Sequence, residues 1–397
     1  MQPRTILHTG KGGAGTTAVA AATARRLAAR GQRTLLLSIS PSGGLADVLG
    51  ANLADGPVAI GEHLTARQVH APQELERHWD AADPWLGDLL VHRGIDRISA
   101  AEVSVPPGAP ELFSLLELRR AIESGEHDAI VVDCPAGAET LRLLAFPEAA
   151  RWWLEKLLPQ RSAQVAAARA FARVLPDEGA IGDAQRLLRE VIAMNELLRD
   201  HERVSIRVVA TPDAGALRET RRTCTALALH GFLTDAIILN RALPQDAGPS
   251  LQGWRAEQAQ QIAGAAAAFA PVPVIVAPLL DRDAAGAAAL DELAQALFAD
   301  TDPGALLHDG VAQAIVLGAR EAELRLELPF AQKDAIDVKH AGLDLIVRVG
   351  EERRTIALPP ALADYRPAGA RFEDGVLRVL FDRAQGEPAV AAADADD

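Results

Sequence analysis

A glycine-rich octet near the N-terminus constrains the fold most strongly. Residues 10–17 read Gly-Lys-Gly-Gly-Ala-Gly-Thr-Thr, directly after the apolar run Thr5–His8 and directly before an alanine-rich stretch. The phosphate-loop pattern G-x-x-x-x-G-K-[ST] has this setting, because glycine amides and a helix N-terminus surround phosphate oxygens. Thr16 stands where the pattern has lysine, whereas its other fixed positions are present as Gly10, Gly15 and Thr17. The octet predicts a fold with a nucleotide site, and its missing lysine leaves open whether that site still functions.

Length, composition and charge exclude several classes of protein. The 397 residues are enough for two or three domains, and 49% of them are apolar, which is enough for a large core. The net charge of -14 argues against a nucleic-acid-binding body. Two cysteines, Cys134 and Cys224, are too few for a disulfide framework and fit a reducing cytoplasm. Neither a signal-peptide pattern nor an apolar run of about 18 residues is present, so we expect a cytoplasmic protein that meets membranes only indirectly.

Short apolar runs alternate with helical stretches up to about residue 300. Runs that are apolar on both sides of the pleat are typical of a parallel sheet covered by helices on both faces. Six runs have this character: Thr5–His8, Thr34–Ser38, Ala129–Asp133, Arg207–Ala210, Ala236–Asn240 and Val274–Ala277. They predict a doubly wound, mostly parallel α/β domain over residues 1–300, with its ligand at the carboxyl ends of the strands.

Two mainly helical insertions are expected in this domain, at roughly 62–125 and 148–205. The second contains Trp152, Trp153 and Leu157 at helical spacing. These side chains fit either core packing or a groove for an apolar client or partner protein.

The composition changes after about residue 301. Residues 301–313 are expected to form a linker and 314–383 a small antiparallel β-sandwich, because apolar residues there alternate with a period of two. The alternating runs are 323–328, 343–349, 355–358 and 376–380. The small and acidic residues 384–397 predict a disordered tail.

A second element supports the phosphate loop. Ile130-Val131-Val132-Asp133 is an apolar strand that ends in a carboxylate. In phosphate-loop proteins an aspartate at this place holds the water shell of Mg²⁺, and the hydroxyl of the loop binds the metal. Thr17 and Asp133 are therefore the predicted magnesium residues.

Several motifs together resemble those of the arsenical pump-driving ATPase (ArsA) family, which includes the guided-entry ATPases for tail-anchored membrane proteins. The octet resembles the family's deviant Walker A motif GKGGxGK[ST], and the segment from Asp133 to Leu144 resembles its switch II. Residues 238–244 resemble its adenine-reading segment. Residues 354–359 and 370–379 are similar to an α-crystallin (small heat-shock protein) domain, which cysteine-free bacterial and plastid members of the family carry at their C-terminus.

The resemblance implies roles for individual residues. Lys11 is expected to reach the phosphates of a dimer partner in trans, Asn240 to read the adenine edge, and the segment with Pro278 and Leu279 to pack on the base. Thr16 replaces the lysine that bridges the β- and γ-phosphates, and Ser40 replaces the aspartate that places the attacking water. The predicted nucleotide-binding residues are Gly10, Gly12, Gly13, Ala14, Gly15, Thr16, Thr17, Asn240, Arg241, Pro278 and Leu279.

Loss at two catalytic positions predicts a degenerate ATPase. Removal of a preorganised transition-state donor costs about 10²- to 10³-fold in rate. We therefore expect a cytoplasmic, dimeric ArsA-like protein that binds ATP and Mg²⁺ weakly or not at all, with nucleotide-gated binding of an apolar client or partner protein. Two alternatives stay open: an active ATP hydrolase that drives anion or metalloid transport, and a structural partner of an intact paralogue to which Lys11 is donated. The dimer is accordingly either a homodimer or a heterodimer, and no nucleic acid is expected.

Overall fold

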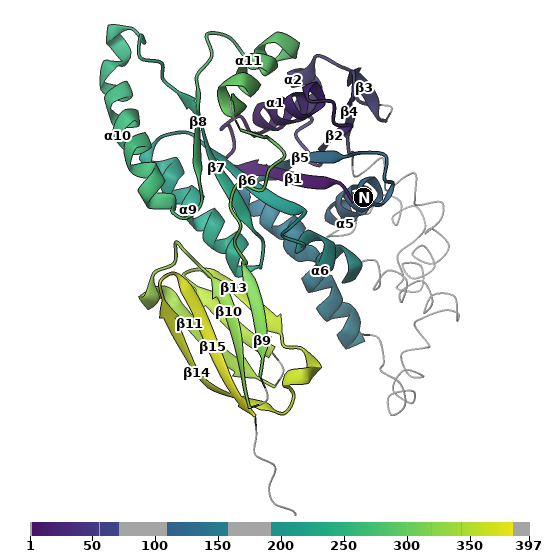
Figure 1. Cartoon of the computed structure of the whole chain (residues 1–397), viewed down its shortest axis with the longest axis vertical. Coiled ribbons are helices and arrows are strands. Elements are labelled where there is room, and N and C mark those ends of the chain that lie inside the picture. Colours follow the sequence, from purple (N-terminus) through teal and green to yellow (C-terminus); the bar gives the residue numbers. More distant parts are fainter. Residues whose placement is uncertain are drawn as a thin grey trace, which may run out of the picture. The chain divides into compact units, whose positions relative to one another are not determined.

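The chain divides into two units (Figure 1). The computed structural model describes residues 2–54, 56–70, 109–157, 192–299, 301–318, 320–342 and 344–383, with the side chains of 109–110 and 150–157 left out. The α/β unit comprises residues 1–224 and 232–310, and the sandwich unit comprises residues 225–231 and 311–397. The predicted tail of 384–397 lies outside the described residues.

An eight-stranded sheet forms the centre of the α/β unit, in the order β3-β4-β2-β5-β1-β6-β7-β8. Every neighbouring pair is parallel except the edge pair β3–β4. The mostly parallel α/β prediction is confirmed, and all six predicted runs are strands of this sheet. The bounds are β1 (Arg4–Gly10), β2 (Thr34–Ser38), β3 (Val58–Gly61), β4 (Leu64–Gln68), β5 (Ala129–Ala136), β6 (Val204–Ala210), β7 (Thr234–Ala242) and β8 (Val274–Pro278).

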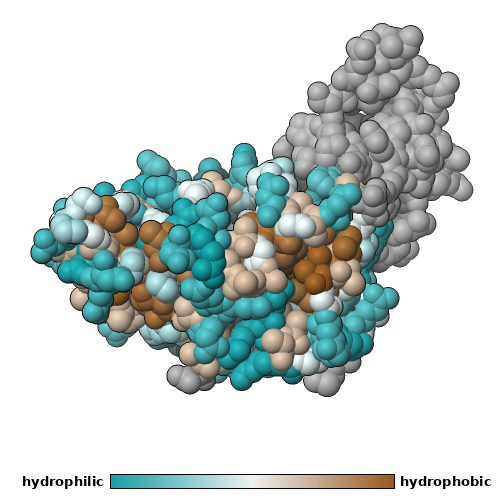
Figure 2. All heavy atoms as spheres, turned by 90° about the horizontal axis from the view of Figure 1, so that it is seen from above, coloured by the Kyte–Doolittle hydropathy of each residue, from teal (hydrophilic) through white to brown (hydrophobic). Residues whose placement is uncertain are grey.

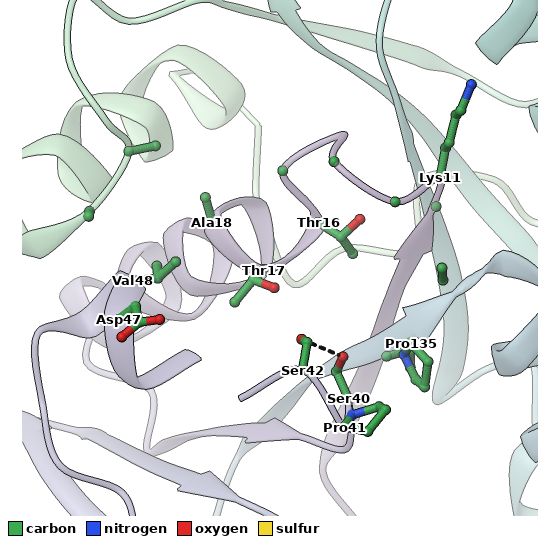
Figure 3. Close-up of a pocket in the computed structure, with 18 of the residues that line it drawn as sticks. Lys11, Thr16, Thr17, Ala18, Ser40, Pro41, Ser42, Asp47, Val48 and Pro135 are labelled. Carbon is green, nitrogen blue, oxygen red and sulfur yellow. Dashed lines mark hydrogen bonds between the residues drawn. The ribbon is translucent and has the colours of Figure 1, made fainter. Parts of the chain in front are cut away.

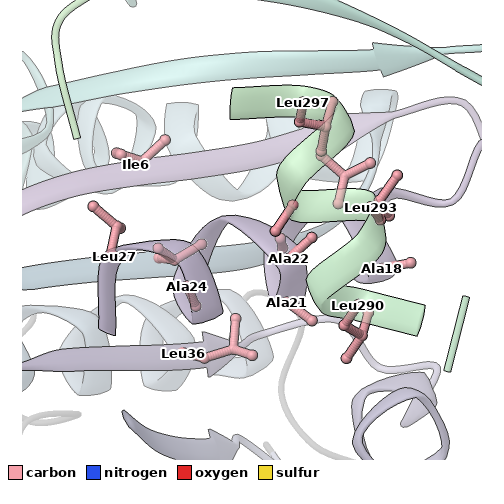
Figure 4. Packing of buried hydrophobic residues seen from close by; sticks show 14 of the residues in the cluster. Ile6, Ala18, Ala21, Ala22, Ala24, Leu27, Leu36, Leu290, Leu293 and Leu297 are labelled. Atoms are coloured by element: carbon pink, nitrogen blue, oxygen red, sulfur yellow. The ribbon is translucent and has the colours of Figure 1, made fainter. Parts of the chain in front are cut away.

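Helices cover this sheet, and small side chains let them pack closely. The helices are α1 (Thr16–Ala29), α2 (Gly44–Leu49), α5 (Ala109–Glu123), α6 (Gly137–Leu157), α9 (Ala214–Leu229), η1 (Pro249–Leu251), α10 (Gln252–Phe269) and α11 (Gly286–Phe298). The alanines of α1 other than the exposed Ala29 lie in one buried cluster with Ile6 of the sheet and with Leu290, Leu293 and Leu297 of α11 (Figure 4). This packing fixes the start of α1, directly after the glycine-rich loop. None of the described helices has both the length and the apolar character needed to span a bilayer.

The first predicted insertion differs from the structure at its beginning. Residues 64–68, expected to open a helical insertion, form strand β4, which pairs with β2 through Thr34 and Leu64. Their sequence, Leu-Thr-Ala-Arg-Gln, lacks the continuous apolar character of the central strands because β4 lies next to the edge of the sheet. Residues 71–108 and 158–191 of the two insertions, together with the side chains of Trp152, Trp153 and Leu157, lie outside the described part of the chain.

The sandwich unit is antiparallel, as expected. One sheet has the order β14-β15-β10-β9 and the other the order β11-β12-β13. Alternating side chains of both sheets, such as Leu324, Val347 and Phe381, fill one buried core. The bounds are β9 (Gln313–Leu317), β10 (Glu321–Glu327), η2 (Lys333–Ala335), β11 (Ile336–Ala341), β12 (Asp344–Val349), β13 (Glu352–Ala357), η3 (Pro360–Leu362), β14 (Tyr365–Glu373) and β15 (Val376–Arg383).

The last turn of α9 belongs to the sandwich core. Leu229 is fully buried in that core. The buried Arg354 donates Nη1–H hydrogen bonds to the Leu229 carbonyl oxygen, at 2.7 Å, and to Gln313 Oε1, at 2.8 Å. The predicted range of 314–383 does not include this turn, because the turn precedes that range by more than eighty residues in the sequence.

A buried group of three charges holds the chain that follows α11. Asp235 is fully buried and lies 3.1 Å from Arg4 Nη2 and 3.3 Å from Nε of the fully buried Arg207. Arg4 Nε donates to the Gly304 carbonyl oxygen, and Arg207 Nη2 donates to that of Ala305. Residues 304–305 of the expected linker are thus fastened to strands β1, β6 and β7 of the α/β unit.

Candidate nucleotide site

Two glycines of the loop between β1 and α1 are required by close contacts. A Cβ on Gly10 would lie 2.0 Å from the Val209 carbonyl oxygen of the neighbouring strand. Gly15 has a left-handed φ of 86°, and a Cβ there would lie 2.5 Å from Asn240 Nδ2. Glycine adopts this conformation without the steric cost that other residues incur. The loop can therefore run close against β6 and β7 and enter α1 directly.

A cavity of about 580 Å³ lies above this loop, and we call it the phosphate cavity (Figure 3). The carboxyl ends of β1, β2 and β5 meet there, as expected for a parallel sheet. Its lining includes the predicted residues Gly10, Lys11, Gly12, Gly13, Gly15, Thr16, Thr17, Ser40 and Arg241, together with Ser42, Asp47, Glu139 and Asp283. A smaller cavity of about 280 Å³, which we call the base cavity, is lined by Asn240, Arg241, Pro278, Leu279 and others. Ala14, in contrast, is buried and lines neither cavity.

Neutral hydroxyl groups stand at both positions where the sequence resemblance led us to expect catalytic charges. Thr16, at the first turn of α1, and Ser40, after β2, lie in the same part of the phosphate cavity (Figure 3). Ser40 Oγ lies 3.0 Å from Ser42 Oγ, within hydrogen-bond distance. Neither group carries the charge needed to stabilise a transferring phosphoryl group or to orient an attacking water.

Asp133 lies within β5, three residues before its end, and its carboxyl group interacts with the Thr17 side chain. Its Oδ2 accepts a hydrogen bond from Ser38 Oγ at 3.0 Å, while the buried Oδ1 has no hydrogen-bond partner. Burial raises the pKa of Asp133 to about 6, and hydrogen bonds from Ser38 and Thr17 oppose the shift. A buried carboxylate oxygen without a partner, next to a threonine hydroxyl, fits the hard oxygen ligands that Mg²⁺ and its water shell prefer.

We predict that Asp133→Asn removes a pH-dependent cost in stability. The raised pKa means that the folded chain binds this proton more tightly than the unfolded chain. The stabilising contribution is complete below pH about 4 and is lost as the pH rises to about 6. From a shift of about 2 pKa units, Asp133→Asn should gain about 2–3 kcal/mol relative to the natural chain between pH 4 and pH 7.5.

Chemical denaturation at both pH values, in a chelating buffer that keeps Mg²⁺ away, measures this gain. Asp128→Asn serves as the matched control, because Asp128 is exposed and its pKa is lowered to about 2 by Arg33. A difference between natural chain and Asp133→Asn that is the same at both pH values would contradict the prediction.

Lys11 extends away from Thr16, Thr17 and Ser40 (Figure 3). Its Nζ lies 3.5 Å from Glu219 Oε2 of α9, and both side chains are about half exposed. An exposed pair of this kind contributes at most about 1 kcal/mol. Lys11 is therefore held only weakly within its own chain.

The side chains of Asn240 and Gln68 brace the site. Asn240 Nδ2 donates to the Ala14 carbonyl oxygen at 2.9 Å, and Gln68 Nε2 donates to that of Ser40 at 2.9 Å. Sequence reasoning gave Asn240 a role at the adenine edge, whereas its amide group is engaged with the loop in this structure. It missed Gln68 and Glu219, since no pattern in the sequence indicates that β4 and α9 reach the site.

Cys134 lines the phosphate cavity, whereas Cys224 of α9 lines neither cavity. Cys134 and Cys224 are both buried, and burial raises the pKa of both thiols. No described group of three or more His, Cys, Asp and Glu side chains has an arrangement suited to a metal ion.

Comparisons with known proteins agree with this architecture. Residues 3–299 match the family model of anion-transporting ATPases, and residues 319–381 match an HSP20-like domain found in ArsA. The chain is 32% identical, over 96% of both chains, to a protein of Chlorobaculum tepidum assigned as an arsenical pump-driving ATPase. It is 34% identical to an uncharacterised protein of Streptomyces coelicolor, over 95% of this chain and 97% of that one. The similarity to the ATPase GET3B of Arabidopsis thaliana is 26% over 71% of this chain and 75% of that protein.

Proposed function

The chain belongs to the anion-transporting ATPase family, and from this premise we propose that it binds an adenine nucleotide and hydrolyses it very slowly. The nucleotide-bound state would control contact with an apolar client or partner protein. The family implies use of a nucleotide. The loss of turnover, the gating, the client and the cytoplasmic setting are the proposal.

One observation carries the proposal. The phosphate cavity keeps the loop, with Thr17 and the buried Asp133 beside it, while Thr16 and Ser40 place neutral hydroxyls where catalysis needs a cation and a carboxylate. Loop amides and the N-terminus of α1 still favour an anion. Binding can therefore persist where the transition state is no longer stabilised.

Calorimetric titration of the full chain with adenine nucleotides, with and without Mg²⁺, tests the proposal. We expect binding that Mg²⁺ strengthens, and Thr17→Ala should weaken the Mg²⁺-dependent part about tenfold because a charge-assisted contact is lost. Ser42→Ala is the matched control, since it removes another hydroxyl that lines the cavity. No binding under either condition would leave the structural-partner alternative. Rapid Mg²⁺-dependent turnover that Asp133→Ala abolishes would favour an active hydrolase that drives anion transport.

Lys11 supports a second candidate function. Because its side chain turns away from its own Thr16 and its ion pair with Glu219 is about half exposed, it is available to a partner's site. A heterodimer with an intact paralogue would use Lys11 there, and a homodimer would bring two degenerate sites together. Sedimentation of the chain alone and mixed with a catalytically intact family member separates the two, and no rise in hydrolysis on mixing would count against donation.

Exposed apolar side chains of the α/β unit give a client or partner protein a surface to contact. Trp254, Val276 and Leu279 are exposed by 54%, 37% and 42%. In Figure 2, brown apolar patches alternate with hydrophilic residues on the face that is shown. Leu279 also lines the base cavity, so a bound base would change the surroundings of one of these side chains.

A further inference from the structure

Arg241 is the cation that connects the two cavities. It lines both of them, as do Gly15, Ala18, Asp283 and Ala284. Its Nη1 donates to the Gly13 carbonyl oxygen at 2.7 Å, which fixes the guanidinium against the loop. Arg241 has a φ of 64°, a left-handed conformation that is uncommon for any residue other than glycine. Such strained residues cluster at ligand sites.

Other cations near these cavities have carboxylate partners, whereas Arg241 has none among the described residues. Lys11 pairs with Glu219, and Arg282 of the base cavity pairs with Asp281 and Glu292. The Arg241 side chain is exposed and keeps further N–H donors beyond the one that Gly13 accepts. A guanidinium of this kind can bind phosphate through two parallel hydrogen bonds.

The phosphate cavity offers positive charge to the α- and β-phosphates of a nucleotide but not to the γ-phosphate. In a phosphate loop the backbone amides surround the α- and β-phosphates, whereas the lysine reaches the β- and γ-phosphates. Arg241 lies between the loop and the base cavity and can serve the first pair. Thr16 and Ser40 offer the γ-phosphate no cation, and the carboxylates of Asp47, Glu139 and Asp283 also line the cavity.

We infer that this site selects a nucleoside diphosphate over the corresponding triphosphate, with Arg241 binding the phosphates that both nucleotides share and no cation serving the third. The inference rests on the proposed function and adds to it the state of the nucleotide. A third phosphate brings further negative charge into a cavity that has lost the lysine for it. The diphosphate keeps every contact that the loop and Arg241 provide.

Calorimetric titration of the full chain with ADP and with ATP, each in excess Mg²⁺, tests the inference. We expect ADP to bind about tenfold more tightly or better, because the third phosphate of ATP adds negative charge to a cavity that carboxylates also line. Arg241→Asn should weaken ADP binding about tenfold, and asparagine is chosen because it tolerates the left-handed conformation. Arg25→Asn is the matched control and should change ADP binding by less than about threefold, because Arg25 pairs with Asp291 and lines neither cavity.

The possible outcomes are distinct. Tighter binding of ATP than of ADP by the natural chain would overturn the inference and leave the proposed function standing. The melting temperature shows whether Arg241→Asn is folded. If the folded variant binds ADP as tightly as the natural chain, Arg241 does not contribute to ADP binding. Binding of neither nucleotide would overturn the proposed function and the inference with it. Because the first comparison needs no variant, poor folding of Arg241→Asn leaves the test intact.

Discussion

The double variant Thr16→Lys with Ser40→Asp is expected to hydrolyse ATP about 10²- to 10³-fold faster than the natural chain, or more if the two effects combine. Lysine at the start of α1 would bridge the β- and γ-phosphates, and aspartate after β2 would orient the attacking water. The surroundings remain in place, because Gln68 still holds the backbone at Ser40 and Asp133 still lies beside Thr17. Release of phosphate by the purified chain in Mg²⁺ measures the gain.

Thr16→Gln with Ser40→Asn is the matched control, since it adds side chains of similar size without the charges. It should stay as slow as the natural chain. If the natural chain already turns over at the rate of the charged variant, other groups replace the missing lysine and aspartate, and the protein is an active hydrolase. A charged variant that folds and binds nucleotide but gains no activity would show that more than these two residues has been lost.

Asp235→Ala is expected to lower the free energy of unfolding of the α/β unit by about 3–5 kcal/mol. Asp235 is the shared partner of Arg4 and Arg207, and its removal leaves two arginines facing each other at a largely buried position. Arg207 is fully buried, and its Nη1 already has no hydrogen-bond partner. Burial also lowers the pKa of Arg4 to about 10, yet this guanidinium keeps its charge at neutral pH.

Asp291→Ala provides the comparison. Asp291 pairs with Arg25 through two hydrogen bonds of 2.7 Å but is 59% exposed, so its loss should cost no more than about 1 kcal/mol. Urea denaturation followed by tryptophan fluorescence measures both changes, because all five tryptophans lie before residue 255, outside the residues of the sandwich unit. Equal losses for the two variants would mean that the buried charges contribute no more than a surface pair.

The central fold could be predicted from the sequence, because its strands carry their own signal. Runs such as Ala129–Asp133 are buried on both faces, and this requires apolar residues at every position. Strands β3 and β4 were missed because one face of each is partly exposed and their runs are short. In the sandwich, β9, β11 and β14 were missed for a similar reason: most of their residues are only partly buried or exposed.

For the candidate site, too, the residues with a sequence signal could be predicted and the others could not. The octet and Asp133 are recognisable because their residue types and spacing are set by contacts with phosphate and metal. Gln68 was not predicted, and Asn240 was predicted at the adenine edge without its contact with the loop, because a single polar residue has no periodic signal. The contribution of Leu229 to the sandwich core depends on a packing partner that is remote in sequence.

By itself, the sequence determined the family and the α/β and sandwich classes, and it predicted that Thr16 and Ser40 replace a lysine and an aspartate. These are properties of residue identity and short-range pattern. Only the tertiary structure decided which charges have partners: Lys11 is held by Glu219, Asp235 joins Arg4 to Arg207, and Arg241 is left to the cavities. The physical reason is that Coulomb and hydrogen-bond energies depend on distances of a few ångströms. The order of the strands in the sheet sets those distances between residues that lie up to about 230 positions apart.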